Sequence, residues 1–270
     1  MTGQQISRPL VMGILNVTPD SFSDGGRFLD TSIAVEHGLS MSQQGADVID
    51  IGGESTRPGA ESVDLETELE RVIPVIESLH AAAPELRLSI DTSKSAVAAA
   101  AVTAGASLIN DVSASLSEVA AETGVGWIAM HRSGDPKTMQ DDPHYDDVVG
   151  EVESDLAHYR DLAADAGITD LWLDPGIGFG KTTEHNLALL AATQRFCRLG
   201  APIVIGVSRK RFTAELTARS DGVAMSTIGM DDRHEASLAA ATFAMLSGAS
   251  MVRCHEVRES VHAASVVAGI

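Results

Sequence analysis

The chain has few aromatic residues, few cysteines and no long hydrophobic run. Aromatic residues make up 4% of its 270 residues, whereas 44% are hydrophobic, so its core must consist mostly of Ala, Val, Ile and Leu. Such residues line small parallel barrels and the helices packed on them. Two cysteines, Cys197 and Cys254, are too few for a disulfide framework, and we expect both to be reduced thiols.

Positive charge is also scarce. The chain has 19 Lys and Arg residues against 38 Asp and Glu residues, a formal net charge of −19. This balance argues against a nucleic-acid partner and against an anionic membrane surface, because both need a basic face. No apolar stretch approaches the roughly 18 residues that span a bilayer, and the N-terminus lacks the apolar segment of a signal peptide. We therefore expect a cytoplasmic protein.

Short apolar runs typical of β-strands recur along the whole chain. The eight runs are Leu10–Leu15, Val48–Ile51, Leu88–Ile90, Leu108–Ile109, Trp127–Met130, Leu171–Leu173, Ile203–Ile205 and Met251–Val252. Helical periodicity fills most of the intervals. The clearest predicted helices are Asp147–Ala166, a segment from the capping residues Asp30 and Thr31 to Gly45, and Arg233–Leu246.

Strands that alternate with helices predict parallel pairing through right-handed crossovers. Eight such units favour an α/β fold of the (β/α)₈ TIM-barrel type over its main competitor, an open doubly wound sheet. No linker or shift in composition marks a second domain. We expect a short tail over residues 1–8 and a single barrel domain over residues 9–270.

Polar and glycine-rich sequence follows every predicted strand at its C-terminal end. The segments are Asn16–Gly26, Gly52–Gly59, Asp91–Ser93, Asn110–Asp111, His131, Asp174–Lys181, Gly206–Arg211 and Arg253–Glu256. Taken singly, each has a plainer explanation: Asp91 alone is as readily a helix cap, and Asp30 and Asp64 are better read as caps. The repetition after all eight strands favours one shared site, because the C-terminal strand ends of a barrel converge on one mouth.

The residue types in these segments suit two kinds of ligand group. Asp91, Asn110 and Asp174 suit a flat heterocycle with an edge of N–H donors, such as a 2-amino-4-oxopterin. Positive charge for a polyanion is supplied by Arg57, Lys181, Lys210, Arg253 and His255. Asn16 adds an oxygen of the kind that Mg²⁺ takes beside substrate phosphates and water. No zinc-ligand spacing or serine-hydrolase elbow is present.

Several segments, in order and spacing, resemble the dihydropteroate synthases, a family of pterin-binding enzymes. They are Met12–Gly26, Ile49–Ala60, Ser89–Lys94, Ile109–Ser113, Met130–Gln140, Leu173–Lys181, Gly206–Lys210 and Arg253–Val257. The resemblance runs from about Pro9 to near the C-terminus. It implies condensation of p-aminobenzoate with 6-hydroxymethyl-7,8-dihydropterin diphosphate, a step in tetrahydrofolate biosynthesis. It also implies Mg²⁺ as cofactor, a homodimer formed through helices on the barrel flank, and competition by sulfonamides.

The resemblance further implies residue roles. Catalysis would fall to Asp91, Asp174, Lys210, Arg253 and His255. Asp91, Asn110, Met130, Asp174 and Lys210 would hold the pterin. Asn16, Arg57, Arg253 and His255 would bind the diphosphate, with Asn16 as the magnesium ligand. The p-aminobenzoate subsite would comprise Phe22, Thr56, Arg57, Pro58, Phe179, Lys210 and Arg211.

Three positions depart from the usual family pattern. Cys254 and Glu256 stand where Val and Asp are usual, and Arg211 stands where many members have Ser. Two other readings stay open: a pterin-binding methyltransferase that serves a corrinoid protein, and a silent paralogue that binds pterin for regulation. The segment Thr56–Pro58 and the pair Arg253 and His255 count against the methyltransferase, which would not need them.

Overall fold

The computed structural model describes residues 8–18, 27–54, 63–134 and 138–270, and for residues 27–30 the backbone alone. The described residues form eight strands: β1 (Leu10–Asn16), β2 (Val48–Gly52), β3 (Arg87–Asp91), β4 (Leu108–Asp111), β5 (Gly126–Met130), β6 (Leu171–Asp174), β7 (Val204–Gly206) and β8 (Met251–Cys254). All paired strands are parallel, in the order β6-β5-β4-β3-β2-β1-β8-β7.

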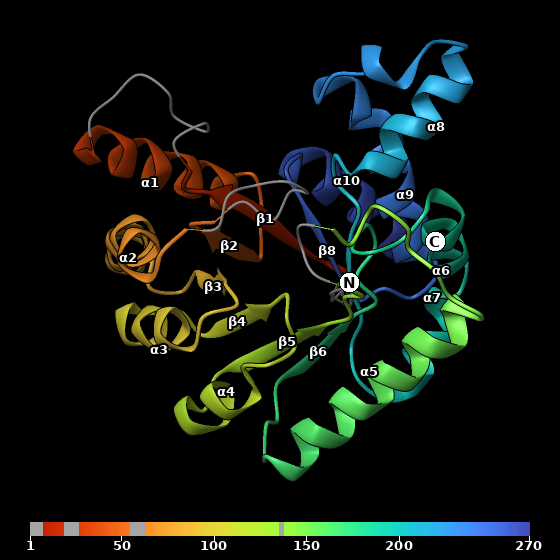
Figure 1. The fold of residues 1–270 in the computed structure, drawn as a ribbon. Helices are drawn as coiled ribbons and strands as arrows, with labels where there is room; N and C mark the ends of the chain where they lie inside the picture. Colours follow the sequence, from red (N-terminus) through yellow and green to blue (C-terminus); the bar gives the residue numbers. More distant parts are fainter. Residues whose placement is uncertain (1–7, 19–26, 55–62, 135–137) are drawn as a thin grey trace, which may run out of the picture.

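The two edges of this sheet meet between β6 and β7. Leu173 forms a parallel bridge with Ile203, and its backbone N–H donates to the carbonyl of Pro202 at 3.0 Å. The strands therefore close into a barrel with the helices outside it (Figure 1). The predicted (β/α)₈ barrel is confirmed, and the open doubly wound alternative is wrong, since β1 lies between β2 and β8.

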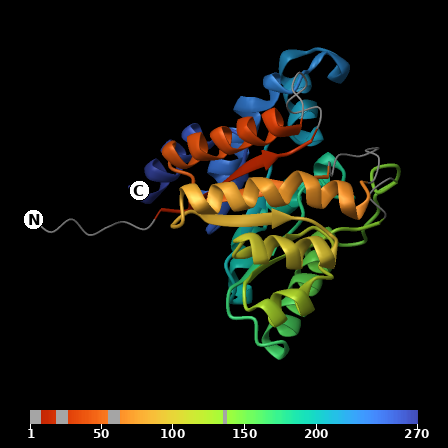
Figure 2. The same ribbon diagram turned by 90° about the vertical axis from the view of Figure 1, so that its left-hand side faces the viewer.

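The helices of the described residues follow the strands in alternation. They are α1 (Arg27–Gln43), α2 (Leu65–Ala82), α3 (Ser95–Ala104), α4 (Ser117–Thr123), α5 (Val148–Asp165), α6 (Thr183–Ala191), α7 (Thr193–Phe196), α8 (Arg211–Asp221), α9 (His234–Leu246) and α10 (Val257–Ala268), with 3₁₀ turns η2 (Cys197–Leu199), η3 (Met225–Thr227) and η4 (Asp231–Arg233). The strand arrows point away from the end of the barrel where the C-terminus lies (Figure 2).

Helix caps explain where two of these helices begin. The carboxylate of Asp147 accepts from the N–H of Gly150 at the start of α5, and Asp64 accepts from Thr67 at 2.8 Å at the start of α2. The prediction for Asp64 is confirmed. Asp30 is not a cap, because α1 already begins at Arg27 and places Asp30 within its first turn.

The inside of the barrel is divided into two layers. Its lower part is an apolar plug from seven strands, made of Met12, Val48, Leu108, Ile128, Trp172, Val204 and Met251. Two residues further along four of these strands stand Asp50, Asn110, Asp174 and Arg253. Because alternate residues of a strand share one face, both sets point into the barrel. We call Asp50, Asp91, Asn110, Asp174 and Arg253 the mouth layer.

One part of the chain projects from the ring of helices. Helix α8 and the turns η3 and η4 stand away from the barrel before the chain returns along α9 (Figure 1). Among the described residues, no helix is both long enough and apolar enough to cross a bilayer.

Candidate active site

Strand register brings the polar residues of five strands to one mouth. Asp91 is paired with Asn110 across β3 and β4, and Met130 with Asp174 across β5 and β6. Arg253 is paired with Met12 on one side and Gly206 on the other. Asp91, Asn110, Asp174 and Met130 are each at most 7% exposed. The predicted convergence of these strand ends on one mouth is therefore confirmed, and the use of that mouth as a binding site stays a prediction.

The centre of the mouth layer is a hydrogen-bonded cluster around Arg253. Its Nε donates to Oδ2 of Asp50 at 2.6 Å, and its Nη2 donates to Oδ2 of Asp91 at 2.7 Å. Nδ2 of Asn110 donates to the same oxygen of Asp50 at 2.9 Å. The side chain of Asp91 is thus committed to Arg253, and α3 has no side-chain cap, so Asp91 is not a helix cap.

Asp50 is a site residue that sequence reasoning missed. It lies inside the apolar run of β2, is fully buried, and orients both Arg253 and Asn110. The signal was available: Asp50 is two residues before Gly52, so it shares the inward face that leads to the polar strand end. A charged residue on the inward face of a barrel strand costs free energy unless it is paired. Its presence indicated a partner at the mouth.

Two carboxylate oxygens of this cluster have no hydrogen-bond partner among the described residues. They are Oδ1 of Asp50 and Oδ1 of Asp91, and both are buried. Burial raises the pKa of Asp91 to about 7, with the negative charges of Asp50 and Glu68 adding to the rise and Arg253 opposing it. A ligand that offers N–H donors at this point would satisfy acceptors that the protein leaves unused.

A second set of opposite charges lies beyond the ends of β6 and β7: the carboxylate of Asp174 and the ammonium of Lys210, which donates to the carbonyl of Ile177. Oδ1 of Asp174 accepts from the N–H of Gly176 at 2.7 Å, and burial raises the pKa of its carboxyl while Lys210 opposes the rise. Burial lowers the pKa of Lys210 to about 8, and its Nζ lies 4.6 Å from the ring centre of Phe179. A Cβ on Gly206 would lie 3.7 Å from that Nζ and 4.0 Å from Oδ2 of Asp174. The missing side chain at Gly206 keeps the space between the two charges open.

Lys181 does not contribute the charge for a polyanion that its place after a glycine-rich loop suggested. Its Nζ donates to the carbonyls of Gly176 and Phe179, each at 3.0 Å, and lies 2.9 Å from Nδ1 of His131. The side chain is 3% exposed, and burial lowers its pKa to about 7. Lys181 therefore fixes the loop that carries Phe179.

Some of the residues predicted to bind the diphosphate lie within the described part of the chain and one does not. Arg253 lies on β8 and His255 is the first residue after this strand, with its Nδ1 2.8 Å from Oγ of Ser208. A Cβ on Gly52 would lie 3.8 Å both from Oδ1 of Asn16 and from Oδ2 of Asp91, so Asn16 borders the mouth layer. Arg57 lies outside the described residues.

The predicted p-aminobenzoate subsite is described only in part. Phe179 and Lys210 are in contact, and Arg211 is the exposed first residue of α8, next to Lys210. Phe22, Thr56 and Pro58 lie, like Arg57, outside the described residues.

The donors near Asn16 fit a magnesium ion held mainly by substrate. The described part of the chain holds no group of three or more His, Cys, Asp or Glu side chains arranged to bind a metal. Mg²⁺ keeps several waters and commonly takes one or two protein oxygens beside substrate phosphate oxygens. One amide oxygen at the edge of the mouth, from Asn16, is compatible with that mode of binding.

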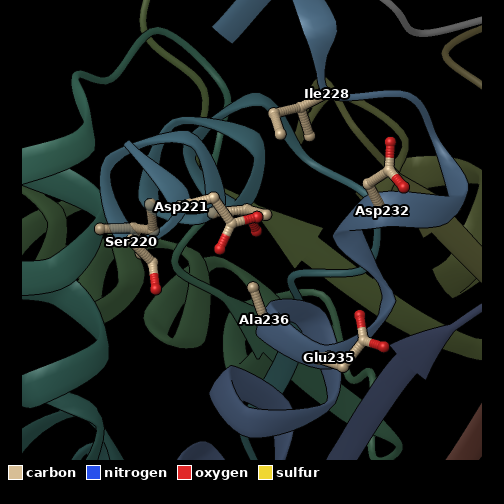
Figure 3. Close-up of a pocket in the computed structure, with 8 residues that line it drawn as sticks. Ser220, Asp221, Ile228, Asp232, Glu235 and Ala236 are labelled. Atoms are coloured by element: carbon tan, nitrogen blue, oxygen red, sulfur yellow. The ribbon is translucent and has the colours of Figure 1, made fainter. Parts of the chain in front are cut away.

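A separate cavity of about 700 Å³ lies between α8 and the start of α9. Ser220, Asp221, Ile228, Asp232 and Glu235 are among its lining residues (Figure 3). Ser220 is ten residues beyond Lys210, about 15 Å along the helix at a rise of about 1.5 Å per residue. Three carboxylates and no cation line this cavity, so it suits a diphosphate far less than the mouth does.

Comparison with known proteins gives consistent results. A model of the pterin binding enzyme family matches residues 12–255. The chain is 46% identical over 265 residues to the dihydropteroate synthase of Mycobacterium leprae, covering 95% of this chain and 92% of that protein. It is 45% identical over 273 residues to the dihydropteroate synthase of Escherichia coli, covering 98% and 93%.

Solved structures of dihydropteroate synthases are also similar to this chain. Dihydropteroate synthase from Xanthomonas albilineans with 4-aminobenzoic acid has a TM-score of 0.86 and 47% identity, covering 97% of this chain and 93% of that one. The same enzyme with 7,8-dihydropteroate has a TM-score of 0.83 and 44% identity, covering 97% and 93%. The Yersinia pestis enzyme in a sulfonamide complex has a TM-score of 0.85 and 42% identity, covering 100% and 98%.

Proposed function

Since the chain belongs to the pterin-binding enzyme family and, within it, to the dihydropteroate synthases, we propose that the barrel mouth is its active site. The chain is accordingly a transferase. The proposed reaction joins p-aminobenzoate to 6-hydroxymethyl-7,8-dihydropterin diphosphate and releases 7,8-dihydropteroate and diphosphate.

The observation that carries this proposal is the pair of unpartnered carboxylate oxygens beside Arg253. Oδ1 of Asp91 and Oδ1 of Asp50 are buried acceptors without donors among the described residues. The 2-amino-4-oxopterin ring offers a row of N–H donors, and a carboxylate can accept two parallel bonds from such an edge. Binding would also favour the ionised form of Asp91, whose pKa burial holds at about 7.

We assign the rest of the pterin subsite to Asn110, Met130, Asp174 and Lys210. All four border the mouth: Asn110 is held by Asp50, and Met130 is paired in register with Asp174. The flat ring would lie over Met130 while the polar edges meet Asn110 and Asp174. Lys210 would donate to a ring acceptor, and its pKa, lowered to about 8 by burial, leaves it mostly charged at neutral pH.

Charge placement suggests how these residues promote the reaction. The departing diphosphate carries negative charge, which Arg253 and His255 would stabilise together with Arg57. The pterin methylene carbon left behind is cationic, with the charge spread into the ring, and Asp91 and Asp174 would face that charge. The aryl amine of p-aminobenzoate then forms the new C–N bond. Bound Mg²⁺, with Asn16 as its protein ligand, would add positive charge at the departing diphosphate.

We place p-aminobenzoate between Phe179, Lys210 and Arg211, with Phe22, Thr56, Arg57 and Pro58 completing the subsite. The contact between Phe179 and Lys210, and the position of Arg211 at the start of α8, support this assignment. A carboxylate is favoured at a helix N-terminus and beside an Arg side chain. A sulfonamide should therefore compete with p-aminobenzoate and not with the pterin diphosphate.

One assay separates this function from its alternatives. The chain is incubated with p-aminobenzoate, the pterin diphosphate and Mg²⁺, and both diphosphate and dihydropteroate are measured. We expect their release in equal amounts. Intact pterin binding without turnover would point to a silent paralogue, and methyl transfer to a corrinoid acceptor would point to the methyltransferase.

The cationic mechanism has its own test. A secondary isotope effect at the pterin methylene carbon distinguishes loss of diphosphate before attack from direct displacement. We expect the large normal effect of a carbon that becomes trigonal. An effect near unity would require an associative displacement.

We also propose that the chain forms a homodimer through its barrel flank. Leu187 of α6 is 41% exposed, and Phe243 and Leu246 of α9 are 49% and 56% exposed. Helices α6 and α9 are neighbours, and we place the contact with a second copy on these exposed apolar side chains. Sedimentation should give a dimer, and Phe243→Glu with Leu246→Glu should give a monomer. A cytoplasmic location stays a prediction, which cell fractionation would test.

A further inference from the structure

The loops that leave β7 and β8 are tied together by a carboxylate and a hydroxyl beside His255. Oγ of Ser208 lies 2.8 Å from Nδ1 of His255 and 3.0 Å from Oε2 of Glu256. The other oxygen of Glu256 accepts from Nε of Arg209 at 2.6 Å. Ser208 is 8% exposed and the Glu256 side chain 11%, so the hydroxyl and the carboxylate are largely shielded from water, whereas the Arg209 side chain is 33% exposed.

Which group donates in each of these hydrogen bonds follows from which of the groups carries a proton. Burial disfavours ionisation of Glu256, but the hydrogen bond and charge of Arg209 and the hydrogen bond from Ser208 hold the pKa of its carboxyl below the usual range. An ionised carboxylate only accepts, so the single proton of Ser208 points to Glu256. Oγ must then accept from Nδ1–H of His255, as it accepts from the backbone N–H of the same residue at 3.2 Å.

We infer that Ser208 and Glu256 are positioning residues that keep a proton on Nδ1 of His255, so that Nε2, protonated in the imidazolium, is the ring atom that donates to a diphosphate oxygen. This inference rests on the proposed function, in which His255 binds the diphosphate. The proton on one ring nitrogen of a histidine is commonly fixed by the hydrogen bond that this nitrogen makes. Glu256 further favours the imidazolium, whose Nε2–H would donate to the anion.

The loop geometry is held on its other side as well. Arg209 has a φ of +57°, a left-handed conformation that costs a non-glycine residue free energy. Its N–H donates to Oγ of Ser237 at 2.9 Å, and its carbonyl accepts from Nη1 of Arg233 at 2.9 Å. These contacts place Ser208 and Arg209 on either side of Glu256. The longer reach of Glu256, compared with the Asp usual in the family, lets one carboxylate meet both.

The decisive variant is Ser208→Ala, which removes the hydroxyl and leaves the Glu256–Arg209 pair in place. Affinities for 6-hydroxymethylpterin and for its diphosphate are measured by calorimetry with Mg²⁺. We expect the diphosphate to bind about tenfold more weakly, the loss typical of one such hydrogen bond, and the pterin alone to bind unchanged. Ser208→Thr, which keeps the hydroxyl, should restore the affinity. Ser237→Ala is the matched control, since Ser237 supports the same loop without touching His255.

Equal losses for both ligands, or an equal loss in Ser237→Ala, would show that Ser208 merely supports the loop. A second measurement is made on the wild-type chain and needs no substitution of Ser208 or Glu256. Long-range ¹H–¹⁵N spectra of the wild-type chain, with His255 assigned by comparison with His255→Gln, should show the proton on Nδ1. A proton on Nε2 alone would overturn the inference. If the wild-type chain binds neither ligand, the proposed function fails, and the spectra still decide the tautomer.

Discussion

The apolar plug and the mouth layer share four strands, on which their residues stand two positions apart, and they differ in almost every physical respect. Val48, Leu108 and Met251 are packed against one another with no polar group to satisfy. Of the next inward residues, Asp50 and Asn110 are nearly as buried and Arg253 is 19% exposed, and they bring charges and, at Asp50, an acceptor without a donor among the described residues. The plug therefore contributes stability to the fold, while the mouth layer leaves two buried carboxylate oxygens without donors among the described residues.

The largest effect that separates the two layers is expected from Asp91→Asn. Turnover should fall by a factor on the order of 10³, because the variant loses the charge that faces the pterin cation. The melting temperature should change little, since the variant keeps the shape of the side chain. Asp47→Asn is the control: Asp47 pairs with Arg8 and with the N–H of Val11 at the opposite end of β2. Full activity in Asp91→Asn would refute the pterin assignment.

The reverse pattern is expected in the plug. Leu108→Ala should destabilise the fold by about 3 kcal/mol, because it leaves a cavity among fully buried side chains. Denaturant unfolding measures this loss, and assays well below the melting temperature measure KM for both substrates. Unchanged KM values would confirm that the two layers act separately. A large rise in KM for the pterin diphosphate would show instead that substrate binding at the mouth depends on the packing of the plug.

A smaller effect is expected from Asp50→Asn, which tests the role of Asp50, the inward-facing residue that follows Val48 on the same strand. One oxygen of Asp50 now accepts from both Arg253 and Asn110. An amide in its place should weaken pterin binding by about 2 kcal/mol, about thirtyfold. Adding Asn110→Asp exchanges donor and acceptor across the pair and should recover part of the affinity. No recovery would mean that the charge of Asp50, and not the orientation of Asn110, matters.

The smallest effect, measured per pH unit, concerns the pH dependence of stability. Burial raises the pKa of Asp91 to about 7 in the folded chain, above its ordinary value of 3.8. The folded state then holds a proton that the unfolded state releases, so this contribution is complete below about pH 4 and is lost as the pH rises towards 7. The slope is at most about 1.4 kcal/mol per pH unit. The difference in unfolding free energy between the wild type and Asp91→Asn should fall from pH 5 to pH 7, and a rise would contradict it.

The barrel and its polar mouth could be predicted from the sequence because both follow from regular spacing. Apolar runs that alternate with helical segments predict the eight units. A polar residue at the C-terminal end of any of these parallel strands lies at the common mouth, whatever side chains surround it. Asp174, for example, could be placed at the mouth because it follows the strand that ends at Leu173, without knowledge of how side chains pack.

Contacts that depend on side-chain paths could not be predicted in the same way. Lys181 follows a glycine-rich loop, as a phosphate ligand would, yet its ammonium turns back to carbonyls of that loop. Asp50 lies in an apolar run, and although its inward position indicates a partner, only the structure identifies that partner as Arg253, more than 200 residues later in the chain. Helix α1 likewise begins at Arg27, three residues before the predicted capping residue Asp30.

The most direct test is a crystal structure of the chain with 6-hydroxymethylpterin bound. We predict that the 2-amino-4-oxo edge of the ring lies against Asp91, Asn110 and Asp174, with an N–H donor on Oδ1 of Asp91. Pterin density in the acidic cavity between α8 and α9, with the mouth layer unchanged, would contradict the account.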